Sequence, residues 1–114
     1  MKDDSVYLKH ILECIKRIAE DTREGHDFFL SSHLHQDAVR RNLQILSEST
    51  QRLSPELKAK CPDVEWKRIA AFRNLIVHDY LGVDMERIWE IVHRDVEELR
   101  SAVEGLLHGI RGKS

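Results

Sequence analysis

An apolar stripe between residues 85 and 106 constrains the fold more strongly than any other feature of the sequence. Its members follow one another in steps of three or four residues: Met85, Trp89, Val92, Val96, Leu99, Val103 and Leu106. This spacing places about one apolar residue per turn on one face of an α-helix. Isolated helices of this length are marginally stable in water, so the rest of the chain must provide elements that cover the stripe.

Three further segments have the same helical periodicity, at residues 5–23, 36–53 and 63–81. The pattern is weakest in the intervening segment EGHDFFLSSHLHQD, where a glycine interrupts it. There we expect Phe28 and Phe29 to cover the core from a short helix or a loop. Each of the three periodic segments is long enough to span a small helical bundle.

Capping residues mark where several of these helices begin and end. Asp63 is expected to cap the third long helix, Gly82 to end it, and Asp84 to begin the last one. Ser54 fits the N-cap of an additional short helix, with proline at its first position, and Pro62 stops that helix.

Four long amphipathic helices with short connections predict an all-α fold, an antiparallel up-and-down bundle of four main helices plus short helices. The chain has 114 residues, which is enough for one modest core, so we expect a single domain over 1–114 with an ordered core at about 5–109. Only five residues are glycine and two are proline, a composition that suits helices better than sheets.

The charge balance limits the kinds of partner. The formal net charge is -2 and the pI is about 6.4, so any contact with a polyanion must depend on a local basic patch. Cys14 and Cys61 match no metal-ligand spacing and are interpreted as free thiols in a reducing compartment. The acidic, amphipathic N-terminal segment does not resemble a signal peptide, and no apolar run reaches the roughly 18 residues of a membrane span. We therefore expect a cytoplasmic protein without membrane contacts.

The stretch RNLIVHDY, residues 73–80, places polar side chains where a helix would bury apolar ones. Arg73 occupies a position in the stripe formed by Trp66, Ile69, Ile76 and Tyr80, where leucine would be expected. A buried arginine without a partner costs several kcal/mol, so an anion must meet it. Three kinds of anion could do so: a carboxylate of another helix, a group of a neighbouring chain, or the phosphate of a ligand.

His78 follows Arg73 by five residues, which turns it about 140° away around an ideal helix. The two side chains therefore converge only if the helix is distorted near its end or if two copies of the chain meet across a twofold axis. We favour the second arrangement. Asn74 precedes His78 by four residues and shares its face of the helix.

These residues resemble the signature of HepT-type toxins in the HEPN superfamily, which is arginine, four residues, histidine, one residue, tyrosine. Here the signature is formed by Arg73, His78 and Tyr80. NLQILSESTQRL also resembles the family's second-helix block, and CPDVEWKRIAAFRNLIVHDY with VDMERIWEIV resembles its most characteristic stretch. The similarity extends over about residues 5–107, with one departure at Ser47, where glycine is expected before the family's glutamate, here Glu48.

The resemblance implies a HEPN domain that acts as the toxin of a type VII-like HEPN/MNT toxin–antitoxin system. It implies a metal-independent endoribonuclease without a cofactor, whose RNA-cleaving site lies at a homodimer interface. The implied partner is a nucleotidyltransferase antitoxin of the minimal MNT type, which transfers AMP from ATP to the motif tyrosine, here Tyr80.

The residue types suit metal-independent RNA cleavage independently of the resemblance. The ribose 2′-hydroxyl can attack its own phosphate if a base with a pKa near neutrality removes its proton, and histidine has such a pKa. Arginine provides a planar, permanently charged fork for the phosphate. We assign His78 as general base or acid and Arg73 as the phosphate-binding residue, with Asn74 and Asp79 in supporting roles. AMP on Tyr80 would bring a phosphate close to Arg73 and block the site.

Each feature also has a purely structural interpretation. Arg73 could pair with a structural carboxylate such as Glu48, His78 could be a core or capping histidine, and Tyr80 an amphipathic anchor. The HLH sequence at 33–35 offers two histidines in an expected loop, which we interpret as solvated surface and not as a metal site.

Two basic pairs, Arg40–Arg41 and Lys67–Arg68, could guide RNA, although solvated helix faces are the simpler interpretation. At the level of the whole protein, the alternative to a ribonuclease is a non-catalytic HEPN module. Such a module would bind its nucleotidyltransferase, or present a substrate to it, without cleaving RNA.

Overall fold

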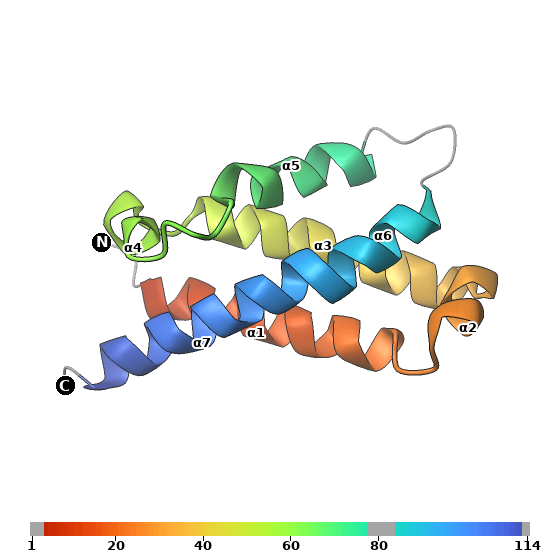
Figure 1. Ribbon diagram of the computed structural model, residues 1–114, viewed down its shortest axis with the longest axis horizontal. Coiled ribbons are helices and arrows are strands. Elements are labelled where there is room, and N and C mark those ends of the chain that lie inside the picture. The colour runs from red at the N-terminus through yellow and green to blue at the C-terminus, as the bar shows by residue number, and fades with distance from the viewer. Residues whose placement is uncertain (1–3, 78–83, 113–114) are drawn as a thin grey trace.

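The computed structural model describes residues 4–77 and 84–112, all in helices and short connections (Figure 1). Its elements are α1 Asp4–Asp21, α2 His26–Ser31, α3 His33–Gln51, α4 Pro55–Ala59, α5 Trp66–Val77, α6 Met85–Ile91, the π-helical turn η1 Val92–Val96, and α7 Glu97–Gly112. Within these ranges there is no strand, and the predicted all-α bundle is confirmed.

The long helices alternate in direction along the bundle (Figure 1). α3 packs against both α1 and α5, and α7 packs against α1. α6, η1 and α7 follow one another without a break and together form the fourth long element, which crosses the others in Figure 1. α5 therefore has α3 as its main neighbour, and one flank of α5 borders open grooves.

The core consists of apolar side chains that all four long elements contribute. Those with no measurable exposure are Leu8, Ile11, Phe29, Val39, Leu43, Leu46, Ile88 and Val103. Fully burying one side chain of this size stabilises the fold by about 1.5–3 kcal/mol, so this shared core fixes how the helices pack.

The segment between α1 and α3 differs from its prediction in two ways. Phe29 is fully buried as expected, but Phe28 is 41% exposed, and its ring lies against the imidazole of His35. The predicted loop at 33–35 is wrong, because α3 already begins at His33. Ser32 is its N-cap and accepts a hydrogen bond from the His35 backbone N–H.

α5, the third of the long helices predicted from the sequence, begins later than expected. Asp63 is not its cap: residues 62–64 form a turn, and α5 starts at Trp66. The Trp66 indole donates to the carbonyls of Lys58 and Cys61, both at 3.2 Å. These carbonyls also accept backbone N–H groups, so the indole adds a second contact that ties the start of α5 to the residues after α4. The predicted end of the helix at Leu81 and Gly82 lies outside the described residues.

The other predicted helix starts are confirmed. The Ser54 side chain accepts from the Leu57 N–H, with proline at the first helical position, and the Asp84 side chain accepts from the Glu86 N–H. The π-helical turn was not predicted. It contains Asp95, which is only 9% exposed and belongs to the buried face of this otherwise apolar segment.

Both cysteines are free thiols, as predicted. Cys14 is buried, and burial raises the pKa of its thiol. None of the helices in the described ranges has the length and apolar character needed to cross a membrane.

Candidate functional site

Arg73 lies on α5 at the edge of the core. Its side chain is 47% exposed, so the expectation that it replaces a core leucine is wrong. Ile69, Phe72 and Ile76 form the buried face of α5 instead, with Phe72 filling the position beside Arg73. The requirement for an anion is still met, because Arg73 Nε donates to Glu48 Oε2 on α3 at 3.2 Å.

This contact uses one edge of the guanidinium. Among the residues that the structure describes, Nε is the only nitrogen of Arg73 that makes a hydrogen bond. An arginine side chain has five N–H donors in a planar fork, and a phosphate binds best to two of them at once. The Glu48 contact therefore orients the fork and leaves its terminal nitrogens without a hydrogen-bond partner among the described residues.

Arg73 and Glu48 line an open groove of about 580 Å³ between α1, α3 and α5. Its other lining residues are Tyr7, His10, Ile45, Ser49, Gln51 and Arg52. Arg52 and Arg73 give the groove two permanent positive charges against the single negative charge of Glu48. This is the local cationic surface that the overall charge of -2 does not reveal.

The other predicted site residues are only partly described. Asn74 is exposed, and no side-chain hydrogen bond holds it within the described residues. His78, Asp79 and Tyr80 lie outside the described residues. Their roles, and the convergence of Arg73 with His78, remain predictions.

Ser47, the departure from the family pattern, is fully buried in α3. Its hydroxyl donates to the Gln44 carbonyl at 2.9 Å, so the polar group is satisfied within its own helix. The next residue, Glu48, nevertheless faces Arg73. The substitution therefore does not disturb the Arg73–Glu48 contact.

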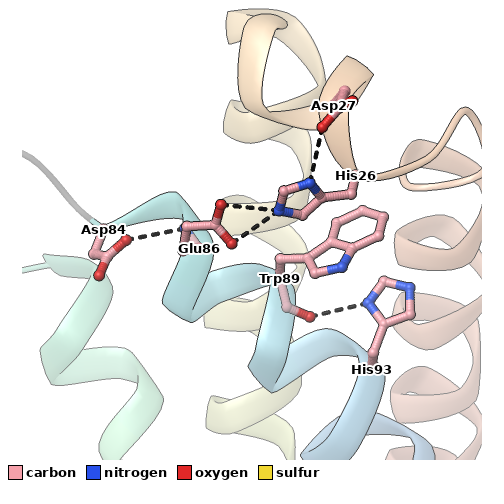
Figure 2. A network of polar contacts seen from close by, with 6 residues as sticks. All are labelled: His26, Asp27, Asp84, Glu86, Trp89 and His93. Atoms are coloured by element: carbon pink, nitrogen blue, oxygen red, sulfur yellow. Dashed lines mark hydrogen bonds and ion pairs between the residues drawn. The ribbon is translucent and has the colours of Figure 1, made fainter.

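A cluster around His26 was missed from the sequence (Figure 2). His26 Nε2 lies 2.9 and 2.8 Å from the two Glu86 carboxylate oxygens, and its Nδ1 lies 3.1 Å from Asp27. Hydrogen bonding to Glu86, and then to Asp27, raises the pKa of His26. The Trp89 ring lies between the imidazoles of His26 and His93, with centroid distances of 5.4 and 4.0 Å.

This cluster joins α2 to the first turn of α6. His26 and Glu86 are 60 residues apart in the chain, and neither belongs to the arginine–histidine–tyrosine signature, so no sequence signal could have paired them. Asp84, which caps α6, lies directly after the segment 78–83 that contains His78 and Tyr80. The cluster thus holds α6, the helix that follows the motif segment 78–83, against α2.

The two basic pairs have different environments. Arg68 is neither a simple solvated residue nor a free RNA contact, because its guanidinium contacts both carboxylate oxygens of the buried Asp95 at 2.9 and 3.2 Å. Arg40 lies 3.9 Å from Asp37. Arg41 and Lys67 are exposed and form no ion pair with any described residue.

Neither the groove nor the His26 cluster contains a metal-ligand arrangement. Within 4–77 and 84–112, no group of three or more histidine, cysteine, aspartate or glutamate side chains is placed to hold a metal ion. His33 is exposed, and His35 Nδ1 lies 2.6 Å from the Ser32 hydroxyl, so these two histidines have separate surroundings.

Three relatives are similar to nearly the whole chain. "Gamma-glutamylcyclotransferase and putative RNase MJ0434" of Methanocaldococcus jannaschii is 38% identical over 104 residues, which are 90% of this chain but 46% of that protein. "Putative RNase MJ1380" of the same organism is 31% identical, covering 90% of this chain and 95% of that protein. "Probable ribonuclease HepT" of Thermococcus cleftensis is 35% identical, covering 88% and 92%.

The chain thus spans about half the length of the first of these relatives and nearly all of the other two. No solved structure matches it significantly. The family described as ribonuclease HepT-like matches residues 11–106, which include all or part of each described helix and the Arg73 motif. The chain therefore belongs to the HepT-like ribonuclease family of the HEPN superfamily.

Proposed function

We propose that this chain is a ribonuclease toxin of the HEPN type that cleaves RNA internally without a metal ion. The observation that carries the proposal is the half-exposed Arg73 guanidinium, oriented by Glu48 and open to a phosphate, within a complete arginine–histidine–tyrosine motif. The names of the relatives, which describe ribonucleases, support the same reaction.

In the proposed reaction, His78 removes the proton of a ribose 2′-hydroxyl, whose oxygen then attacks the adjacent phosphorus. The bond from phosphorus to the 5′-oxygen of the next nucleotide breaks, and that oxygen receives a proton. The products are a 2′,3′-cyclic phosphate and a 5′-hydroxyl. Arg73 stabilises the negative charge that develops on the phosphoryl oxygens.

The site is proposed to be composite, with motifs from two copies of the chain facing one cleft. His78 follows Arg73 by five positions in the sequence, which would point the two side chains in different directions on one straight helix. A twofold axis beside α5 would bring Arg73 of one copy towards His78 of the other. Asn74 would then orient the His78 imidazole or bind the substrate, and Asp79 would support the site.

Regulation is proposed to act through Tyr80. A nucleotidyltransferase of the MNT type would direct the Tyr80 hydroxyl to the α-phosphorus of ATP, forming a tyrosine–AMP phosphodiester and releasing pyrophosphate. The attached phosphate would compete with RNA phosphate for Arg73 and block the site by its bulk and charge.

A non-catalytic HEPN module is the second candidate. The Arg73–Glu48 ion pair favours it, because the same contact could serve only to hold α5 against α3. This candidate predicts binding to the nucleotidyltransferase without RNA cleavage by the unmodified chain.

Cleavage of several RNAs in excess EDTA separates the two candidates. The assay compares unmodified wild-type chain with the variants Arg73→Ala and His78→Ala. Activity that survives chelation and disappears in both variants supports the ribonuclease. Equal activity in all three proteins indicates a contaminating nuclease, and no activity in any of them favours the binding module.

A further inference from the structure

We infer that the face of α3 and α5 around Arg73 is the path of the RNA backbone, with Arg41 and Arg52 as phosphate contacts on either side of the site. The inference rests on the proposed function. It adds the residues that bind RNA phosphates other than the one that reacts. It uses only side chains that the structure describes.

The three arginines are aligned on one surface. Arg41 and Glu48 lie on α3, and Arg52 is the C-cap residue directly after it. Their steps of seven and four residues place them on the same side of the helix. Arg41 and Arg52 are eleven residues apart, or about 16 Å along the axis at about 1.5 Å per residue. Arg73 reaches this face between them, where it contacts Glu48.

Two grooves lie along this face. One of about 330 Å³ is lined by Asp37, Arg40, Arg41, Gln44 and Ile76. The other, of about 580 Å³, contains Arg52, Arg73 and Glu48. Gln44 of the first groove and Glu48 of the second are one helical turn apart on α3, so the two grooves lie next to each other along α3 and α5.

Charge distinguishes the surface formed by these two grooves from the other groove that could bind RNA. Arg41 and Arg52 are exposed, and neither forms an ion pair with any residue in the described ranges. The other candidate is a groove of about 570 Å³ between α5 and α6–η1, which has three arginines but four acidic residues: Asp84, Glu86, Glu90 and Asp95. A polyanion is attracted to the first surface and repelled by the second.

The α1 side of the larger groove provides aromatic rings. Tyr7 and His10 lie with their ring centroids 6.4 Å apart in an edge-to-face arrangement. Bases of single-stranded RNA stack on such rings without regard to sequence, while arginines bind the backbone. The combination fits a single strand better than a duplex, whose bases are already stacked.

The test measures binding of a single-stranded RNA of about 12 nucleotides, fully 2′-O-methylated so that it cannot be cleaved. Its dissociation constant is determined for wild type, Arg41→Gln and Arg52→Gln between about 50 and 200 mM KCl. Each lost phosphate contact should reduce the slope of log affinity against log salt by about 0.7, so the salt increase weakens binding about 2.6-fold less. Arg52→Lys should restore the slope, because a phosphate accepts either cation.

Arg94→Gln is the matched control, since Arg94 is an exposed arginine in the α6–η1 groove and also lacks an ion-pair partner among the described residues. A reduced slope for Arg41→Gln and Arg52→Gln but not for Arg94→Gln supports the path. The opposite pattern overturns it and assigns the RNA to the other groove.

Two results separate this inference from the proposed function. If wild type cleaves unmodified RNA while both variants keep its salt slope, the inference fails and the ribonuclease stands. If wild type neither binds nor cleaves RNA, the proposed function itself fails. Unchanged salt slopes together with a lower sedimentation mass of both variants would instead make this face an interface between copies, which also overturns the path.

Discussion

Arg73 Nε lies 3.2 Å from Glu48 Oε2, and the two side chains are 47% and 46% exposed. An ion pair so open to solvent contributes at most about 1 kcal/mol to stability. It does, however, fix the plane of a guanidinium that has to meet a phosphate. We therefore treat Glu48 as a positioning residue, and the first prediction separates that role from a structural one.

Glu48→Ala should lower kcat for RNA cleavage by about tenfold or more, because a misoriented guanidinium no longer meets the transition state correctly. KM and the melting temperature should change little. Glu48→Gln keeps an acceptor oxygen for Nε and should recover part of the activity. Glu13→Ala is the control, since Glu13 is similarly exposed and pairs with Arg17 on α1 at 3.4 Å.

Arg73→Lys should reduce cleavage by about 10²-fold although it keeps the positive charge. Lysine lacks the planar fork that can donate to Glu48 and to a phosphate at the same time. Because Arg73 lies outside the core, circular dichroism and thermal unfolding should match those of wild type. Near-normal cleavage by the lysine variant would mean that charge alone is needed at this position.

His26 should make stability depend on pH. Its hydrogen bonds to Glu86 and Asp27 raise the pKa of the folded-state imidazole above its unfolded value. A raised pKa means that the native state binds the proton more tightly, so the stabilisation is present below the unfolded pKa and is lost as pH rises through the folded pKa. The difference in melting temperature between wild type and His26→Gln should therefore be larger at about pH 5.5 than at about pH 8.5.

The control for His26 is His33→Gln, an exposed histidine at the start of α3 with no hydrogen bond to a described side chain. Its effect on the melting temperature should be similar at both pH values. If the melting-temperature difference between wild type and His26→Gln did not vary with pH, the charge of the imidazole would not stabilise the fold, and only its packing against Trp89 would.

Arg68→Ala should destabilise the fold, measured by urea unfolding. It removes the hydrogen bond from the Arg68 terminal nitrogen and the ion-pair contact of Nε, and it leaves the Asp95 carboxylate, whose side chain is 10% exposed, without its cationic partner. Arg68→Met combined with Asp95→Leu should recover most of the loss, because no buried charge then remains. If the single variant were as stable as wild type, the pair would be an ordinary surface contact.

The helices could be predicted because the interactions that form them are local in the sequence. Apolar residues at helical spacing and capping residues such as Ser54 and Asp84 act within one or two turns, so they are readable in the sequence. The wrong start of α5 has a tertiary cause, since the Trp66 indole binds the end of α4 and overrides the capping tendency of Asp63. The π-helical turn around Asp95 likewise accompanies a partner on another helix, Arg68.

The site could be predicted only in part. The motif identified Arg73, but a stripe of every third or fourth residue could not decide whether Phe72 or Arg73 faces the core, because neighbouring residues are only about 100° apart on a helix. Glu48 could be named only as one example of a carboxylate on another helix that could meet Arg73, and the structure shows that contact. His26 and Glu86 lie 60 residues apart, and only packing brings them together.

The most direct test of the proposed reaction is the chemistry of the RNA ends. Unmodified wild-type chain would cleave a defined RNA in excess EDTA, and mass spectrometry would identify the termini of the fragments. The account predicts 2′,3′-cyclic phosphates and 5′-hydroxyls, with no cut after a nucleotide that has 2′-deoxyribose. Fragments with 3′-hydroxyls and 5′-phosphates would contradict it, because water and not the 2′-hydroxyl would then be the nucleophile.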